Sequence, residues 1–215
     1  MKRLPKDIFV TGIDTNVGKT IISAILVQAL QADYWKPIQS GIIGSADVDI
    51  VKTLVSNPKS KVHPEAYNLK SPTVPIHSAK LEGIEIDHSN IKLPATPNRL
   101  IVEGAGGLMV HLRRDFMVID LIRHLNIPVV LVSKNYLGSI NHTLLSIEAL
   151  HSRGIEVLGI IYNGERSAHM RDLIHETTGI HEIGSIKTAP HLDREFIDSQ
   201  SLELYYSIKK HYTIV

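Results

Sequence analysis

Short runs of consecutive apolar residues, separated by longer segments of helical pattern, constrain the fold of this chain more than any other feature. The runs 8-IFVTG-12, 128-PVVLVS-133 and 156-EVLGIIYN-163 are continuous and do not alternate with polar residues. Such runs are typical of strands that are buried on both faces of a parallel sheet. The regular alternation of strands and helices therefore predicts an α/β fold, with a doubly wound, mostly parallel sheet and helices on both faces.

The same pattern predicts the positions of the other elements. Strands are expected at 8–12, 128–133, 156–163 and 182–186, and two more run into loops, a short strand within 33–41 and an apolar strand that enters a glycine loop within 99–107. Helices are expected at 20–31, 47–55, 115–125, 141–154, 167–179 and 202–211. Asn141 would cap the fourth of these helices at its N-terminus, and Gly154 would follow its end. Residues 57–98 have poor periodicity and are expected to be irregular. No repeat or linker divides the chain, so residues 1–215 are expected to form a single domain.

Composition excludes several classes of protein. Hydrophobic residues make up 43% of the chain and charged residues 21%, which is ordinary for a globular protein with a core. The net charge of +1 gives no electrostatic reason to expect binding to nucleic acid or to an anionic membrane. The absence of cysteine excludes disulfides, thiolate zinc sites and a cysteine nucleophile. The apolar stretch at 8–10 is too short for a signal peptide. The longer apolar stretch at 21–30 is too short to span a membrane. We expect a soluble, cytoplasmic protein.

The segment 12-GIDTNVGKT-20 follows a predicted strand and opens a predicted helix, which is the context of a phosphate-binding loop. It has five residues between Gly12 and Gly18, whereas the usual pattern has four. Backbone N–H groups of such a loop and the helix N-terminus bind phosphate oxygens. Lys19 would bridge the β- and γ-phosphates, and Thr20 would bind Mg²⁺. The predicted fold is therefore of the P-loop NTPase type. The expected nucleotide-binding residues are Asp14, Asn16, Val17, Gly18, Lys19 and Thr20.

Carboxylates that could hold the metal occur in two other segments. Glu103 ends the predicted strand 100–104, at the edge of the sheet where ligands gather in doubly wound folds. The glycines that follow it allow close approach of a ligand to the backbone. Asp47 and Asp49 open a predicted helix, and either could be a second metal ligand or simply a helix N-terminal acid.

Lys36 ends a short predicted strand and is followed by Pro37. From there it could face the phosphates from the side opposite to Lys19. Taken alone, a lysine in this position is more often an exposed surface residue than a ligand-binding one.

Four segments together resemble dethiobiotin synthetase. They are 12-GIDTNVGKT-20, 36-KPIQSG-41, 103-EGAGG-107 and 138-GSINH-142. The family has G-T-D-T-x-V-G-K-T, Y-K-P-x-x-S-G, V-E-G-A-G-G and L-G-x-I-N-H in the same order, and its loop has the same five-residue spacing. Residues 75–83 resemble a weaker family stretch. Residues 57–98 and the last 50 residues match poorly.

The resemblance implies a reaction. The family closes a urea ring on 7,8-diaminononanoate with CO₂, ATP and Mg²⁺, in the biotin pathway. An amine of the substrate captures CO₂ as a carbamate, the carbamate attacks the γ-phosphate, and the second amine then expels phosphate and closes the ring. Positioning of the reactants and stabilisation of charge would provide most of the catalysis.

The resemblance also implies roles for individual residues. Lys19 and Lys36 would offset repulsion between the carbamate and the triphosphate, while Thr15 and Ser40 would hold the carbamate or the diamine. Thr20, Glu103 and one aspartate would hold Mg²⁺, and alignment with the family favours Asp49 over Asp47. A homodimer is implied, in which the partner chain contributes Gly138, Ser139 and Asn141 to the substrate site.

The chain departs from the family pattern in the region expected to bind the base. In 162-YNGER-166 the family's Asn is kept as Asn163, but Gly164 stands where an acid is usual. Lys187 replaces a proline, and Asn16 replaces an often acidic loop residue. The preference for ATP over other nucleoside triphosphates therefore stays open.

The alternative is a P-loop nucleotide-switch ATPase or GTPase that acts through protein partners. A GTPase should contain Asn-Lys-x-Asp, but 134-KNYLG-138 reads Lys-Asn and has no Asp. A partition ATPase usually has a second lysine early in its loop, where this chain has Ile13 and Asp14. A corrinoid amide ligase of the same fold carries a glutaminase domain that 215 residues cannot include.

Overall fold

The computed structural model describes residues 1–41, 46–165, 168–189 and 191–214. These residues form a seven-stranded sheet in the order β12-β11-β10-β2-β7-β3-β5, and every pair of neighbours is parallel. The strands are β2 (Asp7–Gly12), β3 (Asp33–Trp35), β5 (Val62–His63), β7 (Leu100–Gly107), β10 (Val129–Lys134), β11 (Val157–Asn163) and β12 (Glu182–Ile186). The chain winds from β2 towards β5, returns to β7 beside β2, and continues on the other side to β12. The predicted doubly wound fold is confirmed.

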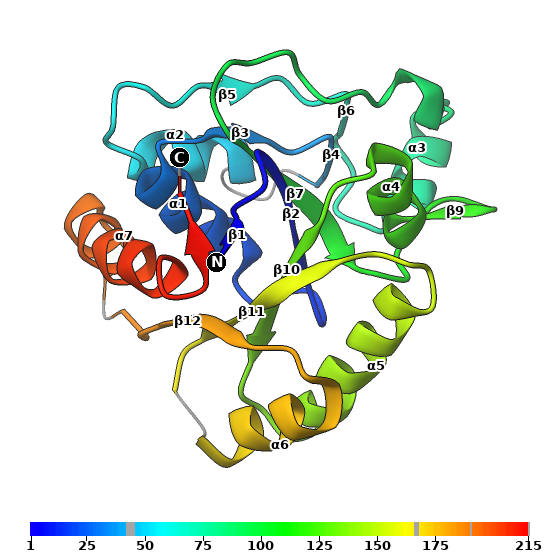
Figure 1. Cartoon of the computed structure of the whole chain (residues 1–215). Helices are drawn as coiled ribbons and strands as arrows, with labels where there is room; N and C mark the ends of the chain where they lie inside the picture. Colours follow the sequence, from blue (N-terminus) through cyan, green and yellow to red (C-terminus); the bar gives the residue numbers. More distant parts are fainter. Residues whose placement is uncertain (42–45, 166–167, 190, 215) are drawn as a thin grey trace.

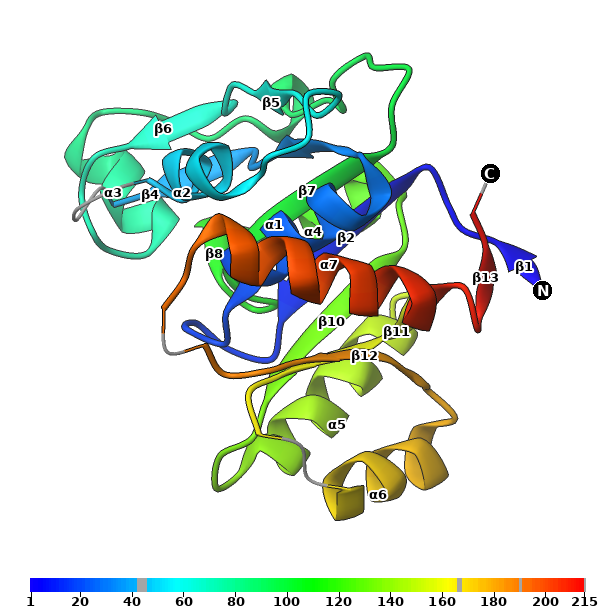
Figure 2. The same cartoon turned by 90° about the vertical axis from the view of Figure 1, so that its left-hand side faces the viewer.

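Helices cover both faces of this sheet (Figure 1). One layer contains α1 (Lys19–Leu30), α2 (Asp47–Leu54) and α7 (Arg194–Ile208), and α1 packs against both of the others. The opposite layer contains α4 (Val118–Leu125), α5 (Ser139–His151) and α6 (Ala168–Thr178). Figure 2 shows α7 lying across the face that α1 also covers. Because helices cover both faces, the strands can be apolar throughout, as Phe9, Val10 and Leu131 illustrate with no exposed surface.

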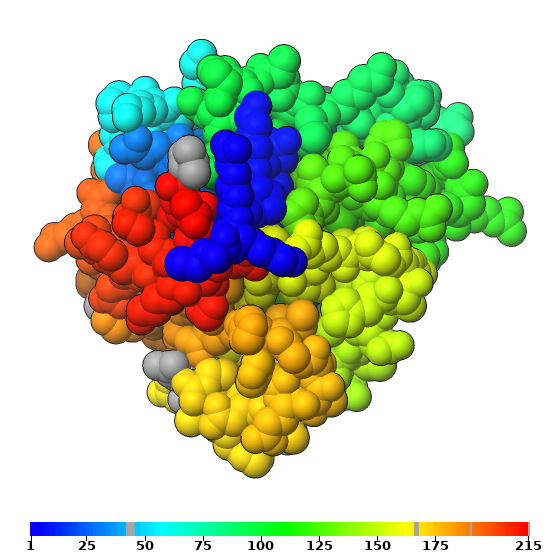
Figure 3. Space-filling view, viewed as in Figure 1, coloured from blue at the N-terminus to red at the C-terminus, as the bar shows by residue number. Residues whose placement is uncertain are grey.

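Small elements surround the central sheet. Two-stranded pairs are formed by β1 (Lys2–Arg3) with β13 (Tyr212–Thr213), by β4 (Ile38–Ser40) with β6 (Tyr67–Leu69), and by β8 (His111–Arg113) with β9 (Phe116–Met117). The β1–β13 pair brings the two ends of the chain side by side (Figure 3). The segment 57–98 contains β5, β6, α3 (Pro75–Leu81) and the 3₁₀ turn η1 (His88–Asn90). Its expected irregularity is therefore only partly correct, because elements this short leave no periodicity in the sequence.

A fully buried carboxylate joins this segment to the sheet. Asp33 accepts hydrogen bonds from the Lys61 backbone N–H (3.0 Å), Thr96 Oγ1 (2.7 Å) and Asn98 Nδ2 (2.8 Å), and it lies 2.8 Å from His63 Nε2. Burial by itself raises the pKa of Asp33, but the hydrogen bonds from Asn98 and Thr96 hold it below its usual value. Loops on both sides of β3 are thereby held by one side chain.

Several predicted helix boundaries are wrong. Helix α7 begins at Arg194 and not at residue 202, because Asp193 caps it by accepting a hydrogen bond from the Phe196 N–H (2.9 Å). Helix α5 begins at Ser139 with Gly138 as its N-cap, so Asn141 lies in the first turn and is not the cap. Helix α4 begins three residues later than predicted because β9 occupies the preceding residues. Ser167, the predicted start of α6, lies outside the described residues.

No helix in the described part of the chain is long and apolar enough to cross a membrane.

Candidate active site

The loop 12–20 connects β2 to α1 at the edge of the sheet where the parallel strands end. Gly18 is the N-cap of α1 and has a φ of 93°, a left-handed conformation that glycine adopts without a steric penalty. The Lys19 ammonium folds back over the loop and donates to the Asp14 carbonyl (3.1 Å). The loop is therefore curved, with the Lys19 side chain lying over it.

The end of β11 holds this loop in place. Asn163 Nδ2 donates to the Val17 carbonyl oxygen at 2.8 Å. A Cβ atom at Gly18 would overlap the same amide nitrogen. Both the positive φ and the close approach of Asn163 therefore require glycine at position 18.

Glu103 is the centre of the polar cluster beside the loop. Its side chain is 1% exposed and lies on β7. Its Oε1 accepts hydrogen bonds from Thr20 Oγ1 and Lys36 Nζ, both at 3.0 Å. Its Oε2 accepts one from Tyr34 Oη at 2.8 Å. Both oxygens of this buried carboxylate are therefore satisfied.

Asp47, and not Asp49, joins this cluster. Asp47 Oδ1 lies 2.8 Å from Thr20 Oγ1 and shares the single hydroxyl proton with Glu103, and its Oδ2 forms a short contact with Lys36 Nζ. Asp49 is exposed and does not line the adjacent cavity. The alignment-based preference for Asp49 is thus not supported by the geometry, because the first turn of α2 points the other aspartate at Thr20 and Glu103.

The two lysines differ in their electrostatic environment. Burial would lower the pKa of Lys36, but the charges of Glu103 and Asp47 outweigh burial and raise it above its usual value. Burial lowers the pKa of Lys19 to about 8, although Glu103 acts in the opposite direction. Lys36 is therefore a firmly charged cation between two carboxylates, whereas the charge of Lys19 is only partly compensated and is suited to an incoming anion.

A cavity of about 760 Å³ opens beside these groups. Its polar wall contains the sequence-predicted residues Thr15, Asn16, Gly18, Lys19, Thr20, Lys36, Ser40, Asp47 and Glu103. Its other wall was missed from the sequence and is partly apolar, with Gln39, Ile50, Val74, Pro75, Val110 and Leu192. Gln39 and Pro75 fall in segments that resemble the family, but no motif marks the others, since these residues come from five separate segments of the chain.

Some predicted site residues lie elsewhere. Asp14 and Val17 belong to the loop but do not line the cavity, and Val17 is buried beneath it. Ser139 is 1% exposed. Its backbone N–H donates to the Tyr136 carbonyl (3.0 Å), and its hydroxyl accepts from the Tyr136 N–H (3.3 Å). Ser139 is therefore occupied within its own chain, whereas Gly138 and Asn141 are exposed.

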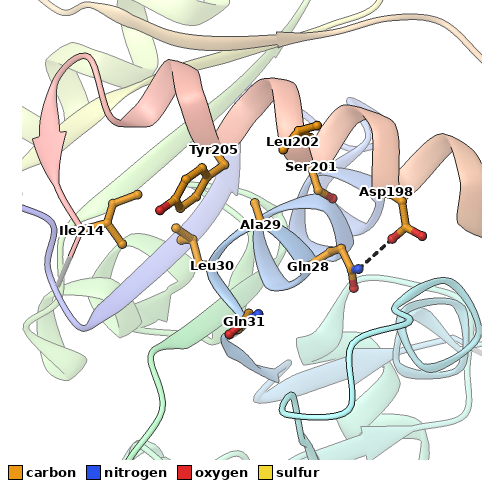
Figure 4. A pocket seen from close by; sticks show the side chains of 9 residues that line it. All are labelled: Gln28, Ala29, Leu30, Gln31, Asp198, Ser201, Leu202, Tyr205 and Ile214. Atoms are coloured by element: carbon orange, nitrogen blue, oxygen red, sulfur yellow. Dashed lines mark hydrogen bonds between the residues drawn. The ribbon is translucent and has the colours of Figure 1, made fainter.

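A second cavity, of about 600 Å³, lies between α1 and α7 (Figure 4). Leu30, Leu202, Tyr205 and Ile214 provide much of its lining. Asp198, the one carboxylate among the described residues of its lining, accepts a hydrogen bond from Gln28 Nε2 (2.7 Å). It contains none of the predicted site residues and is lined by the last turn of α1, whereas the phosphate loop precedes the first turn. It is not a candidate for the chemistry.

Comparisons with known proteins show the family of this chain. A protein family described as an AAA domain matches residues 6–195. The ATP-dependent dethiobiotin synthetase of Christiangramia forsetii is 47% identical over 190 residues, which are 88% of this chain and 91% of that protein. The corresponding synthetase of Cytophaga hutchinsonii is 43% identical over 93% of this chain and 97% of its own length. The chain belongs to the dethiobiotin synthetase family. It is therefore an enzyme, a ligase of biotin synthesis.

Solved structures add support for the fold alone. The ParA family ATPase of Chlorobium tepidum superimposes with a TM-score of 0.58 over 96% of this chain and 97% of its own, at 14% identity. An identity this low carries no information on activity. The likeness shows that this chain shares the fold of that ATPase.

The family's Ser-Gly pair, Ser40–Gly41, connects two parts of the cavity wall. The Ser40 hydroxyl donates to the Thr73 carbonyl (2.6 Å), which joins β4 to the loop before α3. A Cβ atom at Gly41 would lie 2.7 Å from Pro72 Cα. Ser40 thus already has a partner in its own chain, although it remains in the wall of the cavity.

Two of the three departures from the family pattern, Gly164 and Lys187, have a clear structural setting. Gly164 has a φ of 92°, and its N–H donates to the Ile186 carbonyl (2.8 Å). Lys187 is exposed and pairs with Glu203 (2.9 Å). Glycine at 164 thus suits a left-handed turn that holds the ends of β11 and β12 together.

The donor set suits a magnesium ion. Thr20 Oγ1 lies within hydrogen-bond distance of both Asp47 and Glu103, so three hard oxygen groups converge at one point. No group of three or more His, Cys, Asp or Glu side chains that could hold a metal occurs in the described residues. Two carboxylates and a hydroxyl beside a phosphate loop are typical of Mg²⁺, which completes its octahedron with water and phosphate oxygens.

Proposed function

We propose that this enzyme closes a urea ring on 7,8-diaminononanoate, using CO₂ and Mg-ATP, and releases dethiobiotin, ADP and phosphate. One observation carries the proposal. Lys36, held between Asp47 and Glu103, lines the same cavity as the phosphate loop, and several apolar side chains line the rest of that cavity. A site for plain hydrolysis needs no second buried lysine and no apolar wall. A diamine with a hydrocarbon chain needs a surface of this kind.

In this proposal the loop and the two lysines act on the reacting anions. The loop N–H groups and Lys19 bind the triphosphate. Lys36 neutralises the carbamate that forms when a substrate amine captures CO₂ and loses a proton. The two anions can then approach, and charge on the transferring phosphoryl group is stabilised. Thr15 belongs to the loop and lines the cavity, and we assign it to orient the carbamate.

In each of the two later steps one bond to the carbamate group or its phosphate forms while another bond breaks. The carbamate oxygen forms a bond to the γ-phosphorus while the bond from that phosphorus to the bridging oxygen breaks and ADP leaves. The second amine then bonds to the carbonyl carbon, the bond to the phosphate oxygen breaks, and the nitrogen loses a proton. Mg²⁺ supplies neutralisation of phosphate charge when it is bound. Thr20, Asp47 and Glu103 would hold it.

Asp47 and Asp49 provide a matched pair for testing this metal site. Asp47→Asn should lower kcat/KM by about 100-fold, because a charged oxygen beside Thr20 and Glu103 is lost. Asp49→Asn, two residues away on the same helix and exposed, should stay within about twofold of the wild type. The rate of ADP formation as a function of Mg²⁺ concentration measures both. The opposite ranking of the two variants would return the role to Asp49.

A homodimer is part of the proposal, with the exposed start of α5 facing the partner's cavity. Gly138 and Asn141 are available there, and a helix N-terminus suits the carboxylate of the substrate. Ser139 is assigned only to shape this turn, since its side chain and its N–H are already bonded within the chain. We retain ATP as the nucleotide and a cytoplasmic location as parts of the same proposal.

The decisive experiment measures ADP release from the purified protein with bicarbonate and Mg-ATP, with and without 7,8-diaminononanoate. We expect release to depend on the diamine and to match dethiobiotin formation one to one. A nucleotide-switch ATPase would hydrolyse ATP at the same rate without the diamine. That result would overturn the synthetase proposal.

A further inference from the structure

Tyr34 has no exposed surface and comes from the strand next to the one that carries Glu103. In the parallel pairing of β3 with β7, Tyr34 lies opposite Ile101. Glu103 is two residues further along β7, so its side chain is on the same face of the sheet. A tyrosine is long enough to reach such a diagonal neighbour. The resulting hydrogen bond from Tyr34 Oη to Glu103 Oε2 is 2.8 Å long.

We propose that Tyr34 is a positioning residue that holds the Glu103 carboxylate in the orientation needed for Mg²⁺ binding. This inference rests on the metal site of the proposed function. Tyr34 does not line the cavity, so it can act on ligands only through Glu103. With Oε2 held by Tyr34, Oε1 is the oxygen that faces Thr20 and Lys36. Glu103 would accordingly approach the metal with one oxygen and not two.

The division of the two oxygens makes the tyrosine hydroxyl difficult to replace. Thr20 and Lys36 both donate to Oε1, whereas Oε2 accepts a hydrogen bond from Tyr34 alone among the residues that the structure describes. Without that donor, a buried charged oxygen would lack a partner, which is costly. The carboxylate would then rotate towards other donors. Partners that orient a metal ligand typically change metal affinity by 10- to 100-fold when they are removed.

The test is Tyr34→Phe, which removes one hydroxyl and keeps the ring that fills the core. We expect the Mg²⁺ concentration that gives half-maximal enhancement of ADP binding to rise by about 10-fold. ADP binding in EDTA should stay within about twofold, because the loop is untouched. Trp35 is the only tryptophan, is 3% exposed and adjoins Lys36. The fluorescence of Trp35 therefore reports binding without any turnover, and calorimetry provides a second measurement of the same binding.

Tyr212→Phe is the matched control. The Tyr212 hydroxyl also donates a single short bond, to the Leu158 carbonyl (2.7 Å), but it lies at the C-terminal strand β13. This variant should leave the Mg²⁺ dependence unchanged even if its melting temperature falls. Equal losses of stability in both variants, with the wild-type Mg²⁺ dependence in Tyr34→Phe, would overturn the proposal and leave Tyr34 as a core residue.

A double-mutant cycle with Glu103→Gln covers the case in which Tyr34→Phe folds poorly. If Tyr34 acts through Glu103, then Tyr34→Phe should cause no further change in Mg²⁺ dependence once Glu103 is Gln. An additive change would contradict the proposal. These assays use ADP and no diamine, so failure of diamine-dependent turnover and failure of the Tyr34 proposal would be seen separately.

Discussion

Replacing Lys36 by Gln should lower diamine-dependent ADP formation by about 10³-fold. The ammonium lies 3.0 Å from Glu103 Oε1 and also contacts Asp47 Oδ2, in the cavity wall where carbamate and triphosphate are proposed to meet. A neutral amide can donate a hydrogen bond there, but it cannot offset the charges of two anions that must react with each other. Steady-state ADP release with saturating Mg-ATP and diamine measures the loss.

The same substitution should also weaken the metal-free fold. Without the lysine, the buried Glu103 and the half-buried Asp47 face each other with no cation between them. Loss of one partner from such a cluster typically costs about 3 kcal/mol of unfolding free energy. Mg²⁺ and ADP together should restore part of it by supplying positive charge to the same carboxylates. Urea unfolding with and without these ligands measures both effects.

Lys52→Gln is the control for charge removal, since Lys52 is exposed and lies on α2, the helix that also carries Asp47. It should retain wild-type turnover and stability to within about 0.5 kcal/mol. If Lys36→Gln kept turnover within tenfold of the wild type, Lys36 would be only a counter-ion for the two carboxylates. Its role with the carbamate would then have to be abandoned.

Gly18→Ala should abolish high-affinity nucleotide binding, so that the Kd of Mg-ADP rises by at least about 100-fold. The residue has a φ of 93°, and an added methyl group would overlap Asn163 Nδ2. A left-handed alanine costs about 1 kcal/mol or more, and relief of the overlap requires the loop to move away from β11. A displaced loop no longer points its N–H groups at the phosphates. Calorimetric titration gives the Kd.

Gly154→Ala separates backbone strain from steric overlap. Gly154 has a similar positive φ, 68°, but no atom lies within 4 Å of an added Cβ. It should lose about 1 kcal/mol of stability and keep the wild-type Kd. The double variant Gly18→Ala/Asn163→Ala removes the overlap and should recover part of the affinity. Wild-type nucleotide binding in Gly18→Ala alone would show that the loop tolerates the methyl group.

The family and the fold could be read from local sequence. The loop 12–20 acts within one turn between a strand and a helix, so its residues are adjacent in the chain and its spacing is visible directly. The strands are buried on both faces, and this burial appears as uninterrupted apolar residues. Lys36 and Glu103 were expected at the site because each ends the apolar part of a predicted strand, and the ends of parallel strands meet at one edge of the sheet. In the structure Lys36 directly follows β3, whereas β7 continues past Glu103 to Gly107.

Asp47 and Asp49 show where local reasoning fails. They are two residues apart on α2, so their side chains point in very different directions around the helix axis. Val48, Val51 and Leu54 face the core, and the packing of α2 against α1 decides which aspartate reaches Thr20. Alignment to a motif cannot predict how α2 is rotated about its own axis. The N-cap of α7 at Asp193 was missed for a different reason, because one polar residue in an aperiodic stretch is a weak signal.

The sequence by itself determined the phosphate loop, the doubly wound sheet and the family, because each depends on residues that are close in the chain or on burial along one strand. Only the tertiary structure decided which aspartate faces the loop, that Ser139 is occupied within its own chain, and that Tyr34 holds Glu103. These pairings depend on strand register, helix rotation and loop packing. All three arise from contacts between residues far apart in the chain, and no spacing in the sequence records them.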